Sequence, residues 1–282
     1  METPVRILII TLAFLLVSSN VWAFGQDGHR IVCQMALAEL SGPARAEISR
    51  LLDLDPDFSE FSEACLWADT VRNTTHRFTR GWHFINLDQD DLIVDPGDCP
   101  VDRGCVLHGI NVHLATLKND AASDAEKLEA LKFLGHWIGD LHQPLHISFF
   151  EDFGGNQIEI RWLDRKDTNL HSVWDTQMIL TYQREQFADV TAADRWKELA
   201  GELVSEISFS DRADWRQGSP INWGQESYNI TLDPGVRYVE LDESARHPLG
   251  RDYFERNFPI VSERLQKAAI RLAMLLEDAL TQ

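Results

Sequence analysis

The sequence predicts a mostly helical, all-α protein with one short β-hairpin. Apolar residues recur at helical spacing along much of the chain, and only one short stretch alternates as a strand would. With 282 residues, 44% of them hydrophobic, the chain can form one large core, and no low-complexity tract marks a linker. We therefore expect a single domain over residues 24–282, preceded by a segment of a different kind.

That preceding segment, residues 1–23, has the layout of a secretory signal peptide. METPVR is followed by an apolar run from Ile7 to Val17 and then by SSNVWA, which has small residues near its end. The run is shorter than the ~20 apolar residues of an ordinary membrane span. We expect cleavage after Ala23, which leaves Phe24 first in a secreted or periplasmic protein without a membrane anchor. An uncleaved N-terminal anchor is the alternative.

Four segments carry the helical pattern, with apolar residues three and four positions apart. They are residues 29–40, 44–54, 125–142 and 261–280. The strand pattern follows the turn sequence GGN at 154–156, where Ile158, Ile160 and Trp162 alternate with polar residues. This pattern predicts a hairpin rather than a larger sheet.

The four cysteines are an even number, as expected of a disulfide-bonded exported chain. Cys99 and Cys105 bracket the short stretch CPVDRGC, which predicts a small disulfide loop. Cys33 and Cys65 either form a second disulfide or pack as two buried thiols on neighbouring helices.

The net charge of −19 excludes nucleic-acid binding through a diffuse basic surface. A polyanionic substrate would have to be held locally. Bound metal ions can provide this, because a multivalent cation is often the largest charge in its site.

Two His/Asp pairs at four-residue spacing indicate where metal would bind. In GHWIGDLHQPLH, His136 and Asp140 share one helix face, and Pro144 ends the helix so that His146 can turn toward the same space. In NLHSVWD, His171 and Asp175 repeat the spacing. Either pair alone is more typical of a solvated ion pair, so the metal interpretation depends on their occurring together.

Further candidates lie upstream. Asp69 in WADTVR precedes Arg72 by one turn, and His83 lies in the aromatic segment WHFIN. A plain salt bridge and a satisfied core histidine are the simpler interpretations of these residues. His29 lies five residues after Phe24, whose freed amine and carbonyl oxygen could chelate a metal together with the imidazole.

The mixture of histidine and aspartate fits zinc better than calcium or magnesium, which prefer oxygen ligands alone. The sequence has neither the HExxH motif of a zinc protease nor a CxxC pair for a structural zinc ribbon.

At these motifs the chain resembles the zinc-dependent single-strand nucleases of fungi and plants, the type I nucleases, and their bacterial relatives. The likeness runs through FGQDGH, WADTVR, WHFIN, GHWIGDLHQPLH, GGN and NLHSVWD to NWGQES at 222–227. It implies a helical fold of the phospholipase C/nuclease type. It also implies a secreted endonuclease that cleaves single-stranded DNA and RNA to 5′-phosphorylated products, with 3′-nucleotidase activity left open. Its partners would be these nucleic acids and nucleotides, with no stable protein partner.

The resemblance also implies a site with three zinc ions. The first would be bound by Asp69, His83, His136 and Asp140, the second by His146, His171 and Asp175, and the third by the Phe24 amine and carbonyl with His29 and Asp140. Asp69, Arg72 and Asp140 would be catalytic, and Phe84 and Asn86 would form a nucleoside pocket. The family usually begins with Trp where this chain has Phe24, but the implied ligand atoms there belong to the backbone.

Two alternatives remain. A phospholipase C-type phosphodiesterase can use the same metal ligands, because they do not identify the leaving group. From a different class, the chain could be a secreted zinc-binding protein without catalysis.

Overall fold

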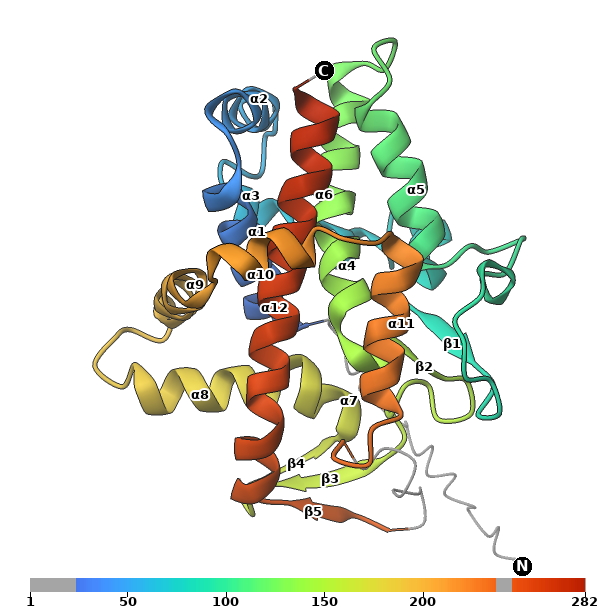
Figure 1. Ribbon diagram of the computed structural model, residues 1–282, viewed down its shortest axis with the longest axis vertical. Coiled ribbons are helices and arrows are strands. Elements are labelled where there is room, and N and C mark those ends of the chain that lie inside the picture. The colour runs from blue at the N-terminus through green and yellow to red at the C-terminus, as the bar shows by residue number, and fades with distance from the viewer. Residues whose placement is uncertain (1–23, 237–244, 282) are drawn as a thin grey trace, which may run out of the picture.

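The computed structural model describes residues 24–236 and 245–281, so the predicted signal peptide lies outside the described residues. The described chain is mostly helical with two small sheets, which confirms the predicted fold class. The C-terminal helix α12 and the green helix α6 run side by side through the middle of the molecule (Figure 1). Across the described ranges, every helix is too short or too polar to cross a bilayer.

The four predicted helical segments are all helices. They are α1 (Gly25–Glu39), α2 (Gly42–Leu52), α6 (Asp124–His142) and α12 (Arg251–Leu280). Ser41 caps α2, and Ser123 forms a capping box with Glu126 at the start of α6. Helix α12 begins earlier than the periodic segment and continues through Pro259, with Tyr253 and Phe254 buried in its first turns.

Other helical elements connect these four helices. They are α3 (Phe61–Ala64), α4 (Trp67–Val71), η1 (Arg77–His83), η2 (Pro96–Asp98), α5 (Val106–Leu117), η3 (Pro144–His146), α7 (Leu170–Ser172), η4 (Val173–Gln177), α8 (Met178–Gln186), α9 (Arg195–Glu206), α10 (Phe209–Trp215) and α11 (Pro220–Thr231).

The predicted hairpin is present but belongs to a larger sheet. Strands β3 (Glu159–Trp162) and β4 (Lys166–Asn169) pair antiparallel, and β5 (His247–Leu249) joins β3 in parallel, at the bottom of Figure 1. A second sheet pairs β1 (Ile85–Leu87) in parallel with β2 (Ile147–Phe149). The sequence predicted a hairpin alone, because three-residue strands are too short to show an alternating pattern.

One hydrophobic cluster extends from Phe24 to Ala279. Within it, α6 packs against α1, α4 and η1 and also against α11 and α12. The structure pairs Cys33 with Cys65, which ties α1 to the segment after α3, and Cys99 with Cys105, which closes a loop before α5. The thiol alternative for Cys33 and Cys65 is therefore wrong, and both disulfides fix segments close to the candidate site.

Candidate metal centre

The C-terminal half of α6 carries the centre of the candidate site. His136 and Asp140 lie on one face of this helix and are both fully buried. Helix α1 brings His29 to the same face, and its ring stacks on that of His136 with centroids 3.8 Å apart. Asp69 from α4 and His83 from the end of η1 complete this part of the site.

Asp140 is shared between different histidines. Its Oδ2 atom lies 3.0 Å from His83 Nδ1 and 3.4 Å from His136 Nε2. Its Oδ1 atom lies 3.4 Å from His29 Nε2 and 3.6 Å from His146 Nδ1. The two oxygens of one carboxylate thus face two separate sets of imidazoles, which is the arrangement that a carboxylate bridging two metal ions needs.

The second His/Asp pair forms its own group. His171 Nε2 lies 3.1 Å from Asp175 Oδ2, and His146 Nε2 lies 3.7 Å from Asp175 Oδ1. Pro144 opens the turn that follows α6 and brings His146 back toward Asp140, as predicted. Asp175 belongs to a single π-helical turn, an irregularity that is frequent at functional sites.

Backbone carbonyls orient three of the histidine rings. His136 Nδ1 donates to the oxygen of Cys65, His146 Nδ1 to that of His83, and His171 Nδ1 to that of Gly154, at 2.8, 2.7 and 2.8 Å. A carbonyl can only accept, so Nδ1 carries the proton in each ring. The Nε2 lone pair of each is thereby left for a metal, as in most histidine–metal sites.

Several buried polar atoms of the site have no hydrogen-bond partner among residues 24–236 and 245–281. They include the Oδ2 atom of Asp69 and the Nε2 atoms of His83 and His146. Leaving one such group unsatisfied costs about 1–3 kcal/mol, so a cluster of them points to a ligand. Three sets of potential ligand atoms each lie within 4.8 Å of one another, namely His29/Asp69/His136, His83/His136/Asp140 and His146/His171/Asp175. The residues therefore fit a group of metal ions with nitrogen and oxygen ligands.

The pKa values of four groups of the site agree with this interpretation, whereas at His171 the effect of Asp175 outweighs burial and raises the pKa. Burial lowers the pKa of His83 and His136 well below the usual value, which favours the neutral imidazole that binds metal. Burial also raises the pKa of Asp140 well above its usual value, with Asp69 adding to the effect. Burial raises the pKa of Asp69 to about 7, and Arg72 opposes the shift. Bound cations would supply the positive charge that these carboxylates lack.

Phe24, the predicted N-terminal ligand, lies at the start of α1 with its ring fully buried. Its φ of 38° is in the left-handed region, and its carbonyl oxygen accepts from the N–H of Gly28 at 3.1 Å. A carbonyl has two lone pairs, so this bond leaves one for a metal. Gly28 is required here because a Cβ atom would lie 2.8 Å from the Cβ of Phe24.

A cavity of 160 Å³, here called the inner cavity, opens beside these ligands. It is lined by the predicted residues Arg72, Phe84 and Asn86 and by the ligands His83, His146 and His171. Arg72 Nη1 lies 3.2 Å from Asp69 Oδ1, so the simple salt bridge is also present. Sequence reasoning missed Phe153 and Asn156, which line the same cavity. The GGN motif was the only signal, since it includes Asn156 and directly follows Phe153.

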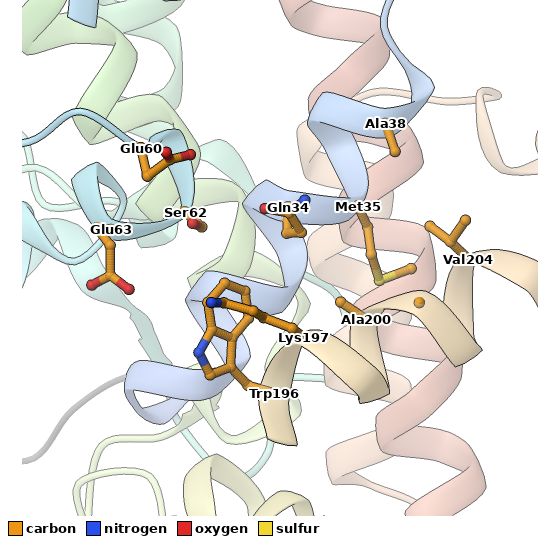
Figure 2. Close-up of a pocket in the computed structure, with 11 residues that line it drawn as sticks. Gln34, Met35, Ala38, Glu60, Ser62, Glu63, Trp196, Lys197, Ala200 and Val204 are labelled. Carbon is orange, nitrogen blue, oxygen red and sulfur yellow. The ribbon is translucent and has the colours of Figure 1, made fainter. Parts of the chain in front are cut away.

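A different cavity, of 460 Å³, lies between α1, the α3 segment and α9 (Figure 2). Trp196 and Lys197 of α9 face Glu60 and Glu63 across it. None of the described residues that line it is a predicted ligand, and Glu63 is already paired with Arg30 at 2.8 Å. This cavity is therefore separate from the candidate metal centre.

Comparison with known proteins agrees with the motifs and the geometry. Residues 24–281 match the S1/P1 nuclease family. The chain belongs to the S1/P1 nuclease family. Endonuclease 1 of Arabidopsis thaliana is 31% identical over 96% of this chain and 91% of its own length. Nuclease S1 of Aspergillus oryzae is 29% identical over 96% of this chain and 97% of its own length. Nuclease P1 of Penicillium citrinum is 31% identical over 55% of this chain and 58% of its own.

Membership of the S1/P1 nuclease family confirms the resemblance drawn from the motifs. It also confirms the enzyme class, a phosphodiesterase that acts on nucleic acid, and favours it over the phospholipase C-type and non-catalytic alternatives. S1/P1 nucleases depend on metal, in agreement with the three His/Asp groups.

Proposed function

We propose that this S1/P1 nuclease is an exported endonuclease that uses three zinc ions to cleave single-stranded DNA and RNA to 5′-phosphorylated products. Residues 24–282 form the catalytic unit, and residues 1–23 are removed during export. The two disulfides support export, because such bonds persist mainly in oxidising compartments.

The observation that carries the proposal is the position of Asp140 between two sets of histidines. In the proposed assignment, Asp140 would be a ligand of two ions. The ligands are Asp69, His83, His136 and Asp140 for the first ion, His146, His171 and Asp175 for the second, and the Phe24 backbone, His29 and Asp140 for the third. Bound zinc supplies positive charge for the phosphodiester and lowers the pKa of a water molecule.

The side chains around the ions have separate roles. Asp69 accepts a hydrogen bond from the attacking water and so orients it toward phosphorus. Arg72, beside Asp69 at the edge of the inner cavity, donates to the phosphoryl oxygens as negative charge grows on them. This local positive charge offsets the net charge of −19, which would otherwise repel the substrate.

Phe84 and Asn86 hold the nucleoside whose 3′-oxygen leaves. The Phe84 ring is 38% exposed at the wall of the inner cavity, where a base can stack on it. Such stacking contributes about 1–3 kcal/mol per base and tolerates any base. A base paired within a duplex is not available for this contact, so single strands are the better substrates.

The N-terminal ligand gives the sharpest test. Zinc content and hydrolysis of single-stranded DNA are measured on protein that starts at Phe24 and on protein with one additional N-terminal residue. We expect the extended protein to lose one zinc ion and most activity, because its amine no longer reaches the site. A protein with one additional C-terminal residue is the control. Equal zinc and activity in all three forms would refute the third metal site.

A further inference from the structure

Phe84 and Asn86 form walls of two cavities. Besides the inner cavity, both residues line a cavity of 140 Å³, here called the outer cavity. None of the described residues around the outer cavity is a predicted metal ligand. The remaining walls include Phe150, Arg103 and Asp98. A strand whose base lies against Phe84 therefore has a second recess next to it, whose described walls contain no predicted metal ligand.

The smaller sheet places an aromatic ring at this recess. Strand β1 carries Asn86 and pairs with β2, and directly after β2 the N–H of Phe150 donates to the oxygen of Leu87 at 3.0 Å. Phe150 is 59% exposed. An exposed aromatic ring beside a nucleoside pocket can stack on a second unpaired base.

The disulfide loop supplies a cation to the lining of the same cavity. Cys99 and Cys105 close this loop, and the indole N–H of Trp82 donates to the oxygen of Arg103 at 2.7 Å. Gly104, at φ 73°, permits this close approach, because a Cβ atom there would lie 2.5 Å from Trp82 Nε1. The backbone that presents Arg103 is therefore fixed against η1, while its side chain remains largely exposed.

The charges around the outer cavity leave Arg103 available to a phosphate. Its only described ion-pair partner is the neighbouring Asp102, at 3.7 Å and with both side chains exposed, and such pairs contribute little. The carboxylate of Asp98, the one acidic group among the described lining residues, accepts from the N–H of Asp95 in a capping box. A guanidinium pairs well with a phosphodiester, because its fork of donors matches two phosphate oxygens.

We propose that the outer cavity is a second nucleotide subsite. It takes the nucleotide on the 5′ side of the one held by Phe84 and Asn86, with its base stacked on Phe150 and the connecting phosphate paired with Arg103. This inference rests on the proposed function, because it extends the strand from the nucleoside whose 3′-oxygen leaves.

A trinucleotide tests the subsite within one molecule. Thymidine trinucleotide, TpTpT, has two bonds, and cleavage at the 3′ bond gives TpT and pT, whereas cleavage at the 5′ bond gives T and pTpT. Only cleavage at the 3′ bond allows both cavities to be filled. We expect initial cleavage at the 3′ bond to be faster by about tenfold, the factor that corresponds to ~1.4 kcal/mol.

The variants Phe150→Ala and Arg103→Ala should each bring the ratio of the two cleavage rates toward one. Phe209→Ala and Arg45→Ala are the matched controls, since both positions are exposed and neither lines the two cavities. These controls should keep the wild-type ratio and rates. Hydrolysis without bias, a bias toward the 5′ bond, or a bias that both test variants retain would overturn the subsite alone. Absence of hydrolysis of both TpTpT and single-stranded DNA by zinc-loaded protein would instead overturn the proposed function.

Discussion

Helix α6 contacts two clusters of polar side chains that differ in their hydrogen bonding. One cluster has atoms without partners, and in the other the side chains pair with one another. In the metal centre, carboxylate and imidazole atoms around Asp140 lack hydrogen-bond partners among the described residues. In the second cluster, here called the arginine cluster, His142, Glu226, Arg264 and Arg271 pair with one another. Arg264 Nη1 lies 2.8 Å from Glu226 Oε2, Arg271 Nη2 lies 2.7 Å from Glu226 Oε1, and Arg271 Nη1 lies 3.0 Å from His142 Nε2.

Arg264 of the arginine cluster and two hydroxyl groups of α11 also donate hydrogen bonds to backbone carbonyls at the end of α6. Arg264 Nε donates to the carbonyl oxygen of His142 at 3.1 Å, and the Ser227 hydroxyl donates to that of Leu141. Thr231 donates to the oxygen of Pro144 at 2.7 Å. The last carbonyls of a helix lack partners within the helix, so these bonds fix the point where the chain turns to His146. The motif NWGQES, which contains Glu226 and Ser227, thus has a structural role.

The pKa values show the same contrast. Burial raises the pKa of Asp140, Asp69 and Asp175 add to the effect, and Arg72 offsets it only in part. Burial would also raise the pKa of Glu226, but Arg271, Arg264 and Lys267 outweigh it and lower this pKa to about 2. One cluster is complete within the protein, whereas the other needs cations. Variants in the two clusters should therefore have different consequences.

The largest effect should follow from Asp140→Ala. This change removes a carboxylate that faces two sets of histidines, so it should lower the bound metal, measured by mass spectrometry. Mutating a residue that only supports a metal ligand already costs up to ~100-fold, so cleavage of single-stranded DNA should fall by more than that factor. Asp252→Ala, at an exposed position on α12, is the control and should keep both. Full metal content and activity in the Asp140 variant would contradict the conclusion that the cluster around Asp140 needs cations.

A smaller effect should follow from Glu226→Gln, and it should be on stability. This change leaves two buried guanidinium groups without their carboxylate, which costs about 3–5 kcal/mol for a fully buried pair. The Glu226 side chain is 36% exposed, so we expect a loss of about 2 kcal/mol in the free energy of unfolding, measured with urea.

The folded Glu226→Gln protein should retain its metal, and Glu255→Gln, exposed on the same helix as the arginines, should be close to neutral. Loss of metal from folded Glu226→Gln protein would show that the two clusters are not independent.

The two clusters also differ in how far the sequence could predict them. The His/Asp spacing on α6 and the break at Pro144 were visible, and the structure brings these residues together as predicted. The arginine cluster was not visible, because Arg264 and Arg271 lie in a periodic helix where a charged residue is normally solvated. Their burial depends on Glu226 of α11, a partner that helical spacing within α12 cannot reveal.

Non-local pairing also explains the other features that the sequence missed. Strands β1 and β2 are three residues each and lie far apart in the chain, so neither carries a pattern that predicts the other. Phe153 lines the inner cavity only because the chain after β2 folds back toward His171. The metal role of Phe24 stays a prediction, because it depends on cleavage at a segment outside the described residues.

The smallest effect should be the pH dependence of the Glu226 contribution. The folded pKa is about 2 and the reference value is 4.5, so the contribution is fully present above about pH 4.5 and is lost as the pH falls toward 2. The difference in unfolding free energy between wild type and Glu226→Gln should therefore shrink between about pH 4.5 and pH 2. Protonation of the metal centre also weakens the protein in acid, but it affects both proteins equally and cancels in the difference. A difference that stays constant over this range would mean that the charge of Glu226 does not stabilise the arginine cluster.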